Sequence, residues 1–226
     1  MCLNRYSLLI FTNRFVSFYT KKLSSLNFIP YITKTLMVKL FMVLVGCTPK
    51  GRNIEQHDVF FSIAKNMEEI IPQAKTFWPE AAAGLHFDAW RTVTHTNGYK
   101  ITVIKKGTDF TNDAQLFFIN LGGYKQHEFE EFHYKMIVAA PDKAAALKYA
   151  KSTAFYKHTG FKGAPSHIDD KFGIDVDDFH NIEDILPEAI KNKYALRIVA
   201  DANNTKEDTF HLGYFVPSKV QKWMNE

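Results

Sequence analysis

Two short patterns of residues that could do chemistry each occur twice in this sequence. Glu-x-His stands at Glu55/His57 and Glu131/His133, and His-x-Asp stands at His86/Asp88 and His167/Asp169. Residues two apart on an extended strand point to the same face, so each pattern sets an imidazole beside a carboxylate. If neighbouring strands carry them, two imidazoles and two carboxylates gather in each copy. Such a set can ligate Zn²⁺ or another divalent ion, or act as a general acid and base.

A purely structural role competes with this chemistry. An imidazole–carboxylate pair also fixes a turn or an interface, and patterns this short often arise by chance. We therefore expect the pairs to be structural, with no metal and no cofactor, while their recurrence keeps a metal-binding cluster as the alternative. No Ser/His/Asp or Cys/His triad can be assembled from the sequence, so it does not decide whether the protein is an enzyme.

An internal repeat sets the positions of these pairs. The 36 residues from Leu40 align without a gap to the 36 residues from Leu116, and eight positions are identical. Random pairing would give about two or three identities. The Glu-x-His pairs occupy matching positions in this alignment, and the His-x-Asp pairs match at a second, shifted offset. The sequence therefore predicts two tandem copies of one module, residues 37–110 and 111–226.

The first copy begins with the apolar run MVKLFMVLVGC, residues 37–47, which also resembles the end of a lipoprotein signal. Its counterpart LFFINLGG stands deep inside the chain, where no signal peptide can be, so we interpret both runs as strands. The preceding segment 1–36 has no repeat partner. We expect it to be an upstream extension that is not part of the native protein, with a targeting peptide or an interfacial amphipathic segment as alternatives.

Each copy is predicted to fold as β-β-α-β-β. Helices that follow paired strands favour an α+β fold, with the two copies packed into one compact unit. Asn66 and Asp142 are the predicted helix N-caps, and Pro72 should kink or shorten the first helix. In the first copy, Asn97-Gly98 predicts a tight hairpin turn. The second copy is expected to close with a C-terminal strand and a short helix.

Composition narrows the class of partner. The 226 residues carry 28 Lys and Arg against 24 Asp and Glu, but segment 1–36 holds five of the basic residues and no acidic one. The rest of the chain has 23 basic and 24 acidic residues, which gives nucleic-acid binding no electrostatic support. The sequence contains no run of 18 apolar residues, so no membrane-spanning helix is expected. With only Cys2 and Cys47, a disulfide framework is excluded and a reducing, cytoplasmic location is favoured.

Longer motifs resemble a known family. The chain contains NIEQHDVFFSIAKN, KTFWPEA, LFFINLGGY, FEEFHYKM and TAFYKHTGFKGAPSHIDDKFGIDVDD. Together these are similar to the bacterial family of domain of unknown function 1543, whose members carry one or two copies of the domain. The resemblance covers nearly all of residues 37–200 and points to a two-copy member. It implies a small soluble bacterial protein, and it supplies no activity, ligand or catalytic residue.

Two classes of function follow from these observations. The first is a binding or interaction protein built from a duplicated module, whose partner is a protein or a small molecule. The second is an enzyme that uses the repeated histidine and carboxylate pairs, with or without a metal. The two classes differ in whether the pairs of one copy converge at an accessible place. We expect the first class.

Overall fold

The computed structural model describes residues 38–124, 127–152, 176–203 and 208–220. The chain divides between Thr35 and Leu36, and every described residue belongs to the second unit, Leu36–Glu226. The predictions made for residues 1–36, for His167 and for Asp169 therefore lie outside the described residues.

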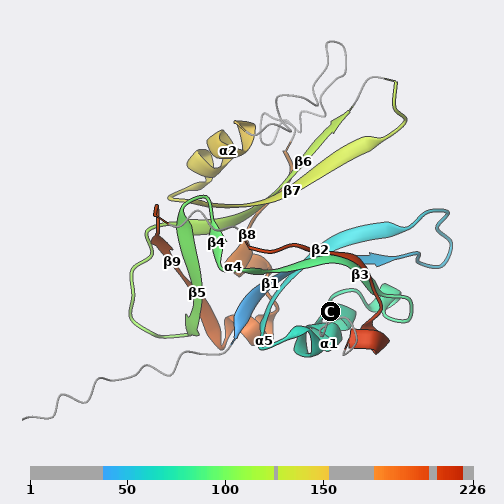
Figure 1. Ribbon diagram of the computed structural model, residues 1–226, viewed down its shortest axis with the longest axis horizontal. Coiled ribbons are helices and arrows are strands. Elements are labelled where there is room, and N and C mark those ends of the chain that lie inside the picture. The colour runs from blue at the N-terminus through green and yellow to red at the C-terminus, as the bar shows by residue number, and fades with distance from the viewer. Residues whose placement is uncertain (1–37, 125–126, 153–175, 204–207, 221–226) are drawn as a thin grey trace, which may run out of the picture. The chain divides into compact units, whose positions relative to one another are not determined.

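In the described part, strands form three antiparallel sheets accompanied by short helices (Figure 1). The first sheet has the order β10-β3-β1-β2, with β1 (Lys39–Cys47), β2 (Gln56–Ala64), β3 (His86–Val93) and β10 (His211–Phe215). The second has the order β7-β6-β8, with β6 (Gln115–Tyr124), β7 (Glu131–Ala140) and β8 (Val176–Asn181). The third has the order β4-β5-β9, with β4 (His95–Thr96), β5 (Tyr99–Lys105) and β9 (Tyr194–Ala200).

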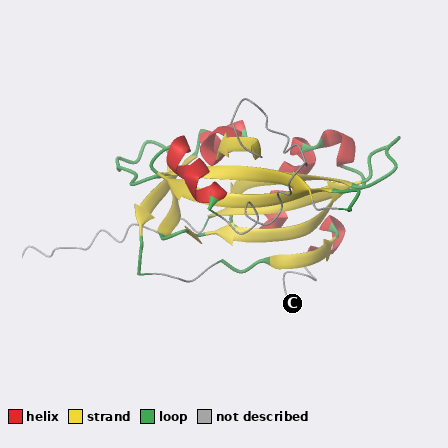
Figure 2. Cartoon of the chain, turned by 90° about the horizontal axis from the view of Figure 1, so that it is seen from above, coloured by secondary structure: helices red, strands yellow, loops and turns green. Residues whose placement is uncertain are grey.

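The helices are short and follow the strands, as Figure 2 shows in red against the yellow strands. They are α1 (Met67–Phe77), α2 (Lys143–Lys151), α4 (Ile182–Ile185), α5 (Glu188–Lys191) and the 3-10 turns η1 (Pro79–Ala81) and η2 (Pro217–Lys219). This mixture of strands and helices confirms the predicted α+β class. None of the described helices is long and apolar enough to cross a membrane.

The two apolar runs form strands, as predicted, and each has a neighbouring strand on both sides in its sheet. β1 pairs with β2 from Lys39↔Ala64 onward, and β6 pairs with β7 from Gln115↔Ala140 onward. Each β1–β2 partner pair thus has a β6–β7 partner pair 76 residues further along the chain. β1 is apolar because it is covered on both faces, which is typical of a central strand.

Both predicted helix caps are present. The side chain of Asn66 accepts a hydrogen bond from the Glu69 amide at 3.1 Å, and that of Asp142 accepts one from the Ala145 amide at 2.8 Å. Pro72 does not shorten the first helix, because α1 runs through it to Phe77. Pro72 lies in the middle of α1, where it removes one backbone hydrogen bond, and the buried face of α1 holds the helix on β2.

The predicted hairpin turn is correct, but the hairpin is short. Asn97 and Gly98 both have positive φ, 34° and 82°, as a type I′ turn requires. The strands beside the turn pair over only two residues, because β3 joins β1 in the first sheet while β5 pairs with β9. β5 belongs to the first predicted copy and β9 to the second, so the last long strands of the two segments form one ladder.

One hydrophobic core draws on all three sheets. Leu40 and Ile63 come from the first sheet, Leu116 from the second and Leu196 from the third, and each is at most 2% exposed. Burial of each such side chain contributes about 1.5 to 3 kcal/mol to stability. The sheets that carry the histidine pairs therefore share a rigid support.

A candidate metal centre

The first histidine–carboxylate cluster lies on one row of paired residues that crosses three neighbouring strands, which we call a rung. Gly46 on the central strand β1 is the register partner of His57 on β2 and also of His86 on β3. Neighbouring strands are about 4.8 Å apart, so the two imidazoles stand on either side of a residue with no side chain. The glycine leaves room for the two rings to lean toward each other.

A β-bulge adds a carboxylate to this rung. Leu44 pairs with Ala89 and Val45 with Phe87, so Asp88 is the extra residue with no partner on β1. Bulges re-aim side chains and are common beside functional sites. Glu55 stands immediately before β2, two residues from His57 and therefore on the same face.

The four side chains of this cluster converge. His86 Nε2 lies 2.8 Å from Glu55 Oε1 and 3.4 Å from Asp88 Oδ1. His57 Nε2 lies 3.2 Å from Asp88 Oδ2 and 3.6 Å from Glu55 Oε2. Each imidazole therefore faces both carboxylates, which matches the arrangement expected if the two pairs of one copy come together.

Burial differs sharply across the cluster. The side chain of His86 is 3% exposed and that of Asp88 25%, whereas those of Glu55 and His57 are 41% and 39% exposed. Burial raises the pKa of the Asp88 carboxyl above its usual value, while His86 and His57 act in the opposite direction. The cluster thus has a dry inner side and a solvent-facing outer side.

His86 has a defined orientation. Its Nδ1 lies 3.3 Å from the carbonyl oxygen of Gly84, which can only accept a hydrogen bond, so Nδ1 carries the proton of that bond. Tyr214 on β10 packs against the other side of the ring, with centroids 4.4 Å apart. The buried Nε2, and Asp88 Oδ2 beside it, make no hydrogen bond within the described part of the chain.

Gly46 is required by this arrangement. A Cβ at that position would lie 2.5 Å from Asp88 Oδ2 and 2.5 Å from His86 Nε2, closer than such atoms approach in real structures. The φ angle of Gly46 is not positive, so the backbone itself does not demand glycine. Glycine is needed here because the ligand atoms occupy the space above it.

A second cluster stands on the second sheet. Gly122 on β6 is the register partner of His133 on β7, and Glu131 lies two residues before that histidine. His133 Nε2 is 3.2 Å from Asp177 Oδ2 and 3.9 Å from Glu131 Oε2. Within the described ranges, these three residues and the trio Glu55, His57 and His86 are the groups whose donor atoms all lie within 4.8 Å of one another.

Comparisons with known proteins address the family and the fold. The family model described as Domain of Unknown Function (DUF1543) matches residues 52–103. Residues 52–103 therefore belong to the DUF1543 family. No curated protein matches the chain. A solved structure, described as the crystal structure of a protein Il1583 from Idiomarina loihiensis, is similar at 22% identity with a TM-score of 0.51, covering 79% of this chain and 97% of that one.

The matched DUF1543 segment contains Glu55, His57, His86 and Asp88, the whole first cluster. The likeness to the Idiomarina structure concerns the fold alone. Neither comparison assigns an activity, so the chemistry of this DUF1543 protein rests on the geometry of its own residues.

For the counterpart of Asp88 in the predicted second copy, the structure offers another aspartate than the one that the sequence alignment matched. The sequence alignment matched Asp88 with Asp169, which lies outside the described residues together with His167. The strand register instead gives that position to Asp177: Asn120 pairs with Asp178 and Leu121 with Val176, so Asp177 is the bulged residue of β8. The signal that could have found it is Val176-Asp177-Asp178-Phe179, which has the same apolar-Asp-x-aromatic pattern as FDAW in β3.

The distances in the first cluster suit a shared cation. Two ligand atoms that are each about 2.1 Å from one ion are separated by about 3.0 Å in octahedral and about 3.4 Å in tetrahedral geometry. The four nitrogen–oxygen distances run from 2.8 to 3.6 Å. Two imidazoles and two carboxylates are ligands that zinc and its first-row neighbours accept.

Proposed function

We propose that this chain binds a divalent transition-metal ion, with Zn²⁺ as the first candidate, between Glu55, His57, His86 and Asp88. The observation that carries the proposal is the state of His86. Its Nδ1 donates a hydrogen bond to the Gly84 carbonyl, and this turns the buried Nε2 toward two carboxylates. A cation shared by the imidazole and the carboxylates would stabilise this arrangement.

The contact between His86 and Glu55 supports this proposal further. Their atoms are 2.8 Å apart, yet Nε2 makes no hydrogen bond. Two ligands of one ion lie beside each other's lone-pair axes rather than on them, which gives a short contact with poor hydrogen-bond geometry. A structural ion pair would instead align the N–H with the carboxylate.

This proposal replaces the structural role that the sequence alone favoured. Glu-x-His and His-x-Asp are weak signals by themselves. What changes their weight is the combination of a buried histidine, a glycine that leaves space for the ligand atoms, and a bulge that aims Asp88 at them. These three features place polar and charged groups close together and partly out of water, which is unfavourable in free energy, and a bound cation would offset this.

We also propose that the chain arose by tandem duplication of a β-β-α-β-β module. Support comes from the constant offset of 76 between the β1–β2 and β6–β7 ladders, and from a bulge with an aspartate at the same place in β3 and β8. On this view Glu131, His133 and Asp177 form a second, weaker metal site.

Zinc binding tests the proposal directly. The full chain, prepared without an affinity tag and treated with a chelator, is titrated with Zn²⁺ against a chromophoric competitor. We expect one tight and one weaker site, and His86→Ala should remove the tight one. The matched control is His95→Ala, because His95 lies on β4 and pairs with Asp201, outside both clusters. A folded wild-type protein that binds no more zinc than His86→Ala would rule the proposal out.

A metal-dependent enzyme is the second candidate, favoured by the exposure of Glu55 and His57. A catalytic zinc keeps one position open to water or substrate, and the outer side of this cluster faces solvent. If so, the zinc-loaded protein should hydrolyse members of a panel of carboxylic and phosphoric esters. The activity should disappear with Asp88→Asn, while His95→Ala retains it. If the zinc-loaded protein turns over no member of the panel, the enzyme candidate is rejected and metal binding remains as the proposed function.

A further inference from the structure

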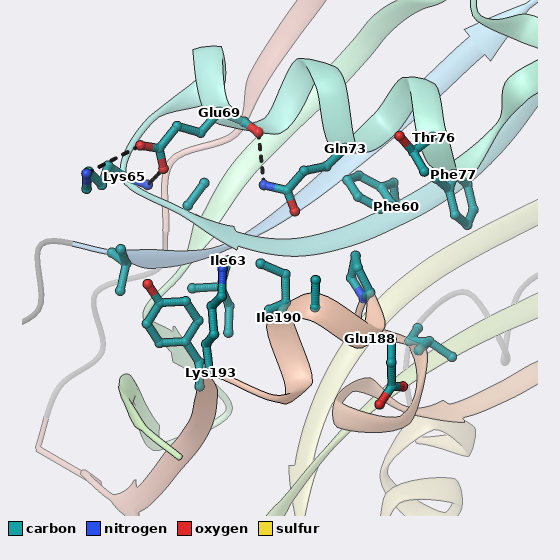
Figure 3. A pocket seen from close by; sticks show the side chains of 16 residues that line it. Phe60, Ile63, Lys65, Glu69, Gln73, Thr76, Phe77, Glu188, Ile190 and Lys193 are labelled. Atoms are coloured by element: carbon teal, nitrogen blue, oxygen red, sulfur yellow. Dashed lines mark hydrogen bonds and ion pairs between the residues drawn. The ribbon is translucent and has the colours of Figure 1, made fainter.

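A second place for a ligand lies far from the histidine cluster. A cleft of about 790 Å³ opens between α1 with β2 on one side and α5 with the start of β9 on the other (Figure 3). Its walls are mostly apolar and include the aliphatic residues Val38, Ile63, Ile185 and Ile190. Clefts of this size and lining are typical of small-molecule sites.

The cleft is distinct from the metal site. It begins at the Val38 end of β1, whereas the histidine cluster surrounds Gly46 near the other end. The lining residue of β2 that comes nearest to the cluster is Phe60, which lies three residues from His57, about 10 Å at about 3.3 Å per residue, and on the opposite face of the strand. The ligand of the cleft therefore does not reach the proposed metal.

Of the charged residues that line the cleft, all except Lys193 have an ion-pair partner among the described residues. Lys65 is 3.6 Å from Glu69, and Glu188 is 2.9 Å from Lys191, a residue that does not line the cleft. Lys193 lines the cleft and makes no ion pair within the described residues. Figure 3 shows its side chain extending from the end of α5 toward Ile63, while the Glu188 carboxylate turns away from α1.

We propose that this cleft binds an aliphatic monocarboxylate, such as a medium-chain fatty acid. The aliphatic walls would take the hydrocarbon chain and Lys193 the carboxylate. Each methylene moved from water into such walls raises affinity about fourfold, so binding should strengthen along octanoate, decanoate and dodecanoate. A cationic head group would be repelled by Lys193.

Calorimetric titration of the full chain tests this inference, with each ligand kept below its micelle concentration. Dodecanoate should bind one per chain, at least about tenfold more tightly than dodecyltrimethylammonium, which has the same tail and the opposite charge. Lys193→Gln should weaken dodecanoate binding about tenfold, since it removes a charge-assisted hydrogen bond. Lys100→Gln is the matched control and should bind like wild type, because Lys100 is exposed on β5 and does not line the cleft.

A blocking variant tests the location independently of charge. Ala189 lines the cleft and is exposed, so Ala189→Trp can fill the cleft without disturbing the core, and it should abolish binding. Thermal melting checks that each variant is folded. Equal affinity for the anionic and cationic ligands, equal binding by Lys193→Gln and Lys100→Gln, or full binding by folded Ala189→Trp would each overturn the inference.

Discussion

The two sheets that carry histidine–carboxylate clusters share their central rung and differ at one end of it. In both, a glycine on the central strand faces a histidine on one neighbour, and a bulge aims an aspartate over the glycine. The first sheet adds His86 on the other neighbour. The described part of the second sheet shows no counterpart of His86.

On the proposed metal binding, this difference indicates which residue would determine the preference for one metal ion over another. Glycine, bulge and Glu-x-His provide a frame that both sheets have. His86 adds a second nitrogen donor, and a site with two imidazoles favours zinc and its neighbours over the hard cations that prefer oxygen. The first sheet also supplies Tyr214, which covers the His86 ring. The described part of the second sheet has no fourth strand in that place.

The glycines give the largest expected effect. Gly46→Ala should lower zinc affinity at the first site by more than about 100-fold, because the added methyl collides with two ligand atoms. The second site should be unchanged. Gly122→Ala should do the reverse, since a Cβ there collides with the Asp177 carboxylate. Zinc titration of both variants measures the two sites separately.

Gly98→Ala serves as the control for these variants. Gly98 lies in the type I′ turn with open space around it, so its substitution strains the backbone without touching either cluster. It should lower the melting temperature and leave zinc binding intact. If Gly46→Ala and Gly122→Ala both bind zinc like wild type, the clusters do not hold metal through the atoms above these glycines.

The bulged aspartates give an intermediate effect and test the corrected alignment. Asp177→Asn should weaken zinc at the second site by about 10- to 100-fold, because it removes the charge of one ligand. Asp169→Asn should have no effect on either site, since the strand register gives the ligand position to Asp177. Competition titration with the two variants side by side decides between the residues. A larger loss with Asp169→Asn would restore the original alignment.

Local signals in the sequence predicted the strands, the helix caps and the Asn97-Gly98 turn. Each depends on nearby residues: an apolar run, an Asn or Asp before a helix, or a pair that accepts positive φ. Much of the first cluster could be predicted for the same reason. A period of two places Glu55 beside His57 on one face, whatever the rest of the fold does.

Features set by pairing between distant segments could not be predicted in this way. The Asp177 bulge depends on how β8 meets β6, 55 residues earlier at Leu121↔Val176, and the sequence alignment, which matched Asp88 with Asp169, does not report that pairing. The burial of His86 depends on neighbours that include Tyr214 of β10, which returns from the end of the chain to pair with β3. Residue types alone do not report such long-range contacts.

Tyr214 gives the smallest expected effect and sharpens the contrast between the two sheets. Its ring packs on His86 with centroids 4.4 Å apart, although the side chain is 70% exposed. An aromatic contact of this kind contributes about 0.5 to 1.5 kcal/mol, so Tyr214→Ala should weaken zinc at the first site by about 2- to 10-fold and leave the second site unchanged. Leu212→Ala is the control, because Leu212 lies on the same strand, is similarly exposed and pairs with Ala89 rather than with a cluster residue. Zinc titrations that place both variants at the wild-type affinity would show that β10 does not hold the His86 ring in position, and that the difference between the sites comes from the donor atoms alone.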